Sequence, residues 1–227
     1  MPRISRRLRR KMAVEALLRE RDLKEIEAMA EREPNVTSAL FGLLSEPDAL
    51  LRWRAIEAVG VLAHKMVEEG GRDGRAQVKD LVRRQLWTMT EESGGTAWHA
   101  AEAVGEMLYN VQSLTEEFAT VLAGNGDTEP YEAPCAWAVA RLANSPARQW
   151  LACEVPAMMK NLEHADPDVR GNSAVALGRL GDEAAISALQ ALVQDEGKFE
   201  RYDFDAGVLR EMTVGQAASA AVAALSV

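Results

Sequence analysis

The sequence of 227 residues contains two cysteines, and aromatic residues make up only 5% of it. Cys135 and Cys153 form no Cys-x-x-Cys pair. This spacing excludes a disulfide framework and a cysteine-based zinc site. Both cysteines fall within segments that we expect to be helical, and we expect them to be small buried residues.

Long apolar runs are also missing. No segment approaches the roughly 18 consecutive apolar residues that a transmembrane helix requires. The basic N-terminus is followed closely by Glu15, so it has no apolar core of the kind found in signal peptides. Proline and glycine form no run long enough to be a flexible linker. We therefore expect a cytoplasmic protein without a membrane span.

One helical pattern recurs along the chain. The segment 51–60 (LRWRAIEAVG) returns as 97–105 (AWHAAEAVG) and, with more changes, as 169–178 (VRGNSAVALG). Aligning each copy on the small residue that ends it gives five anchors with spacings of 45, 35, 38 and 44 residues: Gly60, Gly105, Ala140, Gly178 and Val222. Periods of this length are typical of solenoids built from two-helix units. Small residues at the anchors predict close helix packing.

The repeat predicts the organisation of the chain. Residues 1–31 form a basic N-terminal helical segment, and residues 32–227 form the repeat domain. In each repeat a first helix precedes the anchor helix, and we expect these first helices at 35–44, 73–89, 114–123, 147–163 and 183–193. We expect the second helices near 50–66, 96–110, 131–143, 167–180 and 214–225.

A short stretch of the last repeat differs from the helical pattern. Residues 198–204 (KFERYDF) alternate aromatic with charged side chains at the period of a strand, and Gly207 lies in the turn that follows. We predict a β-hairpin at 198–214. Because two strands alone are marginally stable, we expect Phe199 or Tyr202 to pack on the last repeat.

The third copy of the helical pattern resembles a known family. It is similar to the HEAT-like repeats, specifically the short bacterial type named after phycobilisome lyase subunits, whose unit reads Asp-x-x-Val-Arg-x-x-Ala-x-x-Ala-Leu-Gly. The matching residues are Asp166, Val169, Arg170, Ser173, Ala176, Leu177 and Gly178, with serine in place of the first alanine. The resemblance covers about 35–225 and implies an all-α, right-handed α-solenoid of about five helical hairpins.

Positive charge is concentrated at the N-terminus. The first eleven residues carry six basic side chains and no acid, whereas the net charge of the whole chain is −9, so the remainder carries −15. One interpretation is a solvated helix start that pairs with the acidic body; the other is an arm for RNA, anionic lipid or an acidic partner. We favour the first, because no aromatic residues interleave with the basic ones.

The second helices also predict a surface for binding. Positions seven and three before an anchor lie on one helix face, and basic groups fall beside them. This ridge comprises Trp53, Arg54, Glu57, Trp98, His99, Glu102, Trp137 and Arg141. The tryptophans could simply fill gaps between helices, or the ridge could be a recognition groove, since tryptophan and arginine dominate binding energies.

Enzyme activities receive little support from the sequence. Deoxyhypusine hydroxylase is a HEAT-repeat enzyme with iron bound by His-Glu dipeptides, and this sequence has none. The phycobilisome resemblance raises a bilin or small-ligand lyase or chaperone as an alternative, and HEAT-like DNA glycosylases are a weaker one because an acidic body repels phosphate. We expect a non-catalytic adaptor or assembly factor for a protein partner, without catalytic residues, cofactor or metal, with nucleic acid disfavoured and self-association open.

Overall fold

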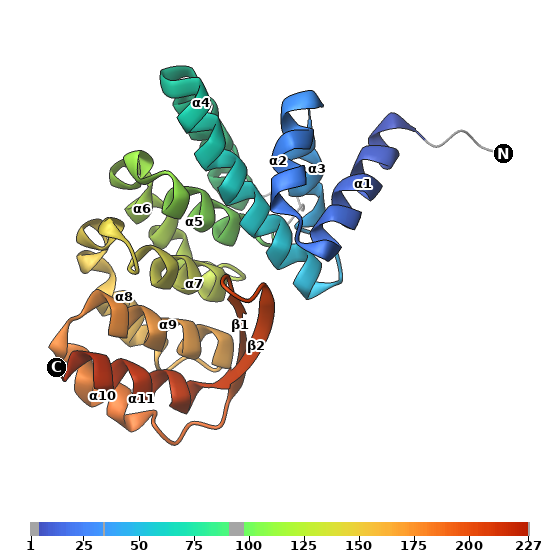
Figure 1. Cartoon of the computed structure of the whole chain (residues 1–227). Helices are drawn as coiled ribbons and strands as arrows, with labels where there is room; N and C mark the ends of the chain where they lie inside the picture. The colour runs from blue at the N-terminus through green and yellow to red at the C-terminus, as the bar shows by residue number, and fades with distance from the viewer. Residues whose placement is uncertain (1–4, 34, 91–97, 227) are drawn as a thin grey trace. The chain divides into compact units, whose positions relative to one another are not determined.

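A computed structural model describes residues 5–33, 35–90 and 98–226 of the chain. The chain divides into two compact units. The first comprises Met1–Val111 together with Phe204–Val208, and the second comprises Gln112–Asp203 together with Leu209–Val227. The α-helices and strands, labelled as in Figure 1, are α1 (Arg6–Glu20), α2 (Leu23–Arg32), α3 (Val36–Leu43), α4 (Ala49–Thr90), α5 (Ala100–Asn110), α6 (Thr115–Ala123), α7 (Glu132–Leu142), α8 (Val155–Asn161), α9 (Pro167–Leu180), α10 (Ile186–Ala191), β1 (Lys198–Asp203), β2 (Val208–Thr213) and α11 (Val214–Leu225).

The first unit is built around α4 and α5, which pack against each other. A Cβ atom on Gly60 would lie 2.6 Å from the side-chain nitrogen of Asn110, so the anchor of the first repeat has to be glycine. The sequence predicts separate helices at 50–66 and 73–89. Both lie within α4, which is divided into two helices at Gly71, where φ of 52° and ψ of −121° break the helical geometry. The predicted start of the next second helix, at 96–97, lies outside the described residues.

The second unit stacks its second helices in sequence order. In Figure 1, α9 lies between α7 and α11, and it packs against both. The approach to α11 is close, because a Cβ atom on Gly178 would lie 2.8 Å from the Cα atom of Ala221. This stacking of repeated helices confirms the predicted all-α repeat architecture and the role of the small anchor residues.

The arginine of the repeat motif has the same structural role in two copies. Arg170 donates to the main-chain oxygens of His164 and Ala165, each at 2.7 Å. Arg52, at the matching position of the first repeat, donates to the oxygens of Glu46 at 2.6 Å and Pro47 at 3.0 Å. In both cases the guanidinium satisfies carbonyls of the turn before the helix. The motif therefore encodes how each turn attaches to its second helix.

The hairpin predicted at 198–214 is present as β1 and β2, which form a two-stranded sheet. Phe199 and Tyr202 of β1 are buried, as expected. Phe199 packs on α9, because a Cβ atom on Gly171 would lie 2.5 Å from its ring. The missing side chain of Gly171 thus makes room for the strand.

Two expectations for the second unit are wrong. The segment 147–163 is not one helix: it consists of the short 3₁₀ helices Pro146–Trp150 and Ala152–Glu154, followed by α8. Proline at the start of α8 lacks the N–H that a continuous helix would need. Cys135 is buried, but Cys153, in this broken segment, is exposed.

Candidate functional site

The first-repeat part of the ridge is occupied by contacts within the first unit. Glu57 is buried on α4, and its carboxylate accepts from Arg21 Nε at 3.0 Å and from a terminal nitrogen of the same guanidinium at 2.6 Å. Arg21 also donates to the main-chain oxygens of Phe204 and Asp205, in the turn between β1 and β2. Glu57 therefore orients an arginine that binds the hairpin turn.

Arg54 binds the same segments as Arg21. Its guanidinium donates to the oxygen of Leu18 at 3.1 Å, near the end of α1, and to the oxygen of Gly207 at 3.2 Å. Gly207 has a φ of 68°, and a Cβ atom there would lie 2.4 Å from the side chain of Arg21. The geometry makes Arg54 a structural residue, and Trp53 beside it is partly buried.

The second-repeat part of the ridge is different, because Trp98 is exposed. Its exposed fraction is 58%, and it lies in the turn before α5. His99 follows, and its Nδ1 lies 3.0 Å from one carboxylate oxygen of Glu102. Glu102 itself is 5% exposed, and its other oxygen has no hydrogen-bond partner among the residues that the structure describes. A large exposed aromatic therefore lies beside a buried carboxylate with unused acceptor capacity.

In the second unit, the predicted residues lie on α7. Trp137 is 2% exposed and belongs to the core, as one of the two interpretations of the sequence had it. Arg141, one turn further along, is only partly buried. It has two arginine neighbours that the sequence reasoning missed, Arg179 on α9 and Arg201 on β1.

Signals for some of the missed residues exist in the sequence. Arg179 directly follows the anchor Gly178, as Arg141 follows Ala140, so the repeat register places them at equivalent positions. Arg21 carries no such signal, because it lies outside the repeats and has a left-handed backbone with φ of 54°.

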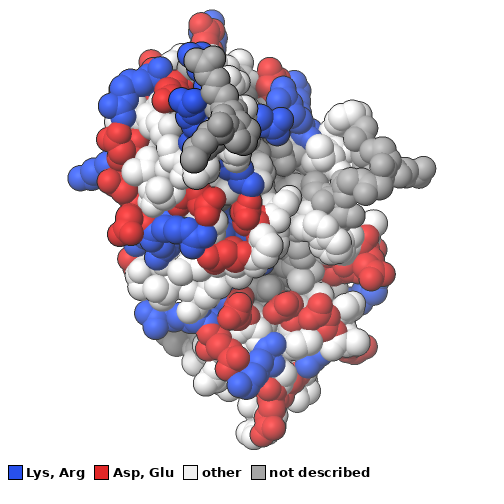
Figure 2. Space-filling view, turned by 90° about the vertical axis from the view of Figure 1, so that its right-hand side faces the viewer, with Lys and Arg blue, Asp and Glu red and all other residues white. Residues whose placement is uncertain are grey.

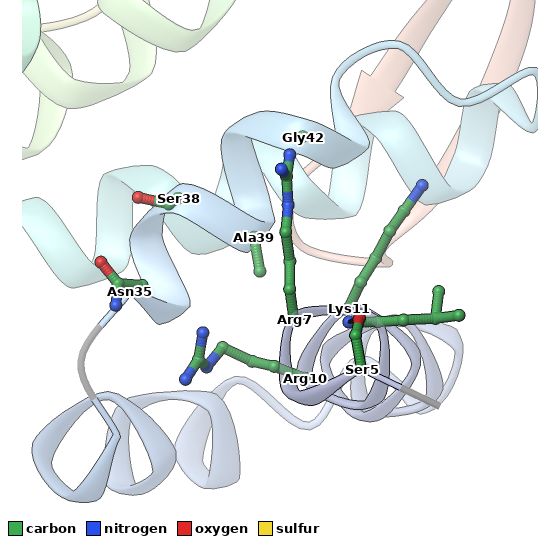
Figure 3. Close-up of a pocket in the computed structure, with 9 residues that line it drawn as sticks. Ser5, Arg7, Arg10, Lys11, Asn35, Ser38, Ala39 and Gly42 are labelled. Carbon is green, nitrogen blue, oxygen red and sulfur yellow. Dashed lines mark hydrogen bonds between the residues drawn. The ribbon is translucent and has the colours of Figure 1, made fainter. Parts of the chain in front are cut away.

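The basic N-terminal segment forms a groove with α3. Figure 3 shows Arg7 and Arg10 of α1 extending toward the surface of α3, where Ser38 and Gly42 leave space. The hollow has a volume of about 550 Å³. Arg10 pairs with Glu33 at 3.2 Å, and Lys11 pairs with Glu46. The pairing of basic side chains with nearby acids agrees with the interpretation of a helix start that is partly neutralised.

On the face drawn in Figure 2, Lys and Arg side chains lie among Asp and Glu side chains. This face therefore offers no continuous basic field of the kind that binds nucleic acid phosphates. Within the described residues, no group of three His, Cys, Asp or Glu side chains is arranged to hold a metal ion, and no helix is long and apolar enough to cross a membrane.

Comparisons with known proteins identify the repeat. Residues 128–203 match the sequence profile of HEAT repeats. A search of curated protein sequences returned no match. The solved structure of an engineered protein is similar, with a TM-score of 0.50 and 20% identity over 95% of this chain and 90% of that chain, which shows the fold alone. An archaeal HEAT-like repeats protein from Thermococcus onnurineus NA1 has a TM-score of 0.40 and 12% identity over 99% of this chain and 82% of its own.

Proposed function

We propose that this chain, in which residues 128–203 match HEAT repeats, is a non-catalytic adaptor or assembly factor that binds a protein partner through its second helices. Repeats of this kind offer extended surfaces in which each unit contributes a few side chains. Trp98, His99, Glu102 and Arg141 would contact the partner. Arg54, Glu57 and Trp137 would support that surface from within, because hydrogen bonds occupy the first two and Trp137 is buried; Trp53 is partly buried beside them.

The exposure of Trp98 beside Glu102 carries this proposal. Tryptophan is enriched among the residues that contribute most to protein interfaces, and its large apolar area gains most when a partner removes it from water. Glu102 has a buried oxygen without a hydrogen-bond partner among the described residues. A lysine or arginine of the partner that reached this oxygen would form a charge-assisted hydrogen bond in a site of low solvent access.

The test compares variants in capture of a partner. The tagged protein is used to isolate partners from its native cell extract, and the bound proteins are quantified by mass spectrometry. The affinity for the partner enriched by the wild type is then measured with purified components. Trp98→Ala and Glu102→Gln should each weaken binding by at least about tenfold, which corresponds to about 1.4 kcal/mol.

Trp87 provides a matched control. Its exposed fraction is 60%, close to that of Trp98, but it lies on the last turns of α4 and outside the predicted ridge. Trp87→Ala should leave binding unchanged. Equal losses in the Trp87 and Trp98 variants would show general stickiness of exposed tryptophan, and no loss in either would contradict the proposed surface. Unchanged helical circular dichroism of each variant ensures that the fold is retained.

A further inference from the structure

Three arginines of the second unit are close enough to influence one another. Arg141 lies in the last turn of α7, Arg179 lies in the last turn of α9, and Arg201 lies in β1. Burial, together with the positive charges of Arg179 and Arg141, lowers the pKa of the Arg201 guanidinium to about 9. Since arginine ordinarily stays charged far above neutral pH, the cluster still carries three positive charges.

The charge of Arg201 is not balanced by the described residues. Its guanidinium donates to the side-chain oxygen of Asn172 at 2.5 Å, and Asn172 is itself buried. No carboxylate among the described residues forms an ion pair with Arg201. An amide dipole does not neutralise a full charge, and a partly buried cation beside two others costs free energy. An anion at this point would remove that cost.

Two of the three arginines, Arg179 and Arg201, border a cavity in the second unit. The cavity has a volume of about 340 Å³ and lies between α9, α11 and the hairpin. Arg179 and Arg201 line one part of it. The other lining residues are apolar or glycine and include Val175, Met212 and the α11 alanines Ala220 and Ala224. The site therefore combines a cationic end with apolar walls.

We propose that this cavity binds the carboxylate side chain of an acidic segment in a protein partner, with the apolar walls contacting the neighbouring side chains of that segment. The inference deepens the proposed adaptor function and rests on it. Guanidinium groups pair with carboxylates through two parallel hydrogen bonds, and an aspartate or glutamate next to an apolar residue matches both halves of the cavity. A polyphosphate or nucleic acid fits less well, because the chain beyond its first eleven residues carries −15.

A pair of peptides tests the chemistry directly. The first is a short fluorescein-labelled peptide in which glutamate alternates with leucine and alanine, and the second replaces each glutamate by glutamine. Binding to the full chain is followed by fluorescence anisotropy at moderate salt. The glutamate peptide should bind at least about tenfold more tightly than the glutamine peptide, since only the former carries the carboxylates that the arginines pair with.

Three variants locate the binding site. Arg179→Gln should weaken binding of the glutamate peptide by about tenfold. Arg210→Gln is the matched control: Arg210 lies on β2, pairs with Asp203 at 2.6 Å and does not line the cavity, so binding should be unchanged. Arg201→Met should abolish the preference for glutamate and at the same time raise the melting temperature, because it removes a partly buried charge that no carboxylate among the described residues balances.

The stability readout separates a binding role from a structural one. If Arg201→Met lowers the melting temperature, the guanidinium is required by the fold and the proposal is wrong. Equal affinity for the two peptides, or displacement of the glutamate peptide by inorganic triphosphate at lower concentration than by glutamate, would also overturn it. The Trp98 and Glu102 variants test the first unit. If they lose partner binding while the peptide experiment fails, the cavity proposal is wrong and the adaptor function is still supported.

Discussion

Replacement of Arg21 by alanine should destabilise the first unit by about 3–5 kcal/mol, the range found when one partner of a buried ion pair is removed. The Glu57 side chain is 8% exposed and the Arg21 side chain 25%, so water cannot replace the lost cation fully. The substitution also removes the donors to the oxygens of Phe204 and Asp205. The loss in the free energy of unfolding therefore comes from contacts with both α4 and the hairpin turn.

Two further substitutions check the origin of this cost. Arg21→Gly should be less destabilising than Arg21→Ala by about 1 kcal/mol, because residue 21 has a φ of 54° that glycine adopts without strain. The double variant Arg21→Met with Glu57→Met should recover most of the loss, since replacing both members of a buried pair with apolar residues is often neutral. An additive loss in the double variant would contradict the assigned pair.

The free energy of unfolding is measured by urea denaturation followed by helical circular dichroism. Hydrogen exchange of α1 and α4 amides assigns the effect to the first unit. Arg32→Ala is the control, because Arg32 and Glu25 form a pair whose side chains are 63% and 46% exposed. Exposed pairs contribute at most about 1 kcal/mol. The reasoning fails if Arg21→Ala costs no more than Arg32→Ala.

The second unit gives three more predictions. Gly171→Ala should destabilise the protein by about 1–3 kcal/mol, because the added methyl meets the ring of Phe199, and Phe199→Leu in the same chain should recover part of the loss in thermal unfolding. The hydrogen bond from Arg170 lowers the pKa of Asp195, so its contribution to stability is present at neutral pH and is lost as the pH falls through that lowered value; acid unfolding of Asp195→Asn should lack this component. Partial desolvation and the neighbouring negative charge of Glu154 raise the pKa of the Cys153 thiol, although the residue is exposed. Iodoacetamide should therefore label it more slowly than a free cysteine at neutral pH, and equal rates measured by mass spectrometry would contradict this.

The fold was predictable because a small residue recurs at the same position of each repeat, and these positions are where helices approach closely. Gly60 and Gly178 mark those positions, and the structure places another helix against each. The segment 147–163 was harder to predict, because its apolar pattern suits a helix while Pro156 stops one. The continuity of α4 up to Gly71 could not be read from the sequence either, since polar residues on an exposed helix resemble those of a loop.

The candidate site was predictable only where the repeat determines it. Helix periodicity placed Glu57 and Glu102 at equivalent positions. Both are buried, and the carboxylate of each lies within hydrogen-bond distance of a side-chain nitrogen, from Arg21 and His99 respectively. The identity of that neighbour depends on contacts between distant segments. Arg21 reaches Glu57 from 36 residues away, and Arg201 comes from a hairpin that interrupts the repeat. Such contacts leave no periodic signal in the chain.

The first unit includes the turn of the hairpin, so its completion depends on residues near the C-terminal end of the chain. Solenoid units usually form from neighbouring segments, so they can fold as they leave the ribosome. Here Arg21 donates to the oxygen of Phe204, a contact across 183 residues. The first unit therefore reaches its final set of hydrogen bonds only after almost the whole chain has been synthesised. During synthesis, the guanidinium of Arg21 lacks its acceptors, the main-chain oxygens of Phe204 and Asp205, until those residues have been made. Completion of the N-terminal unit is therefore a late event rather than an early one.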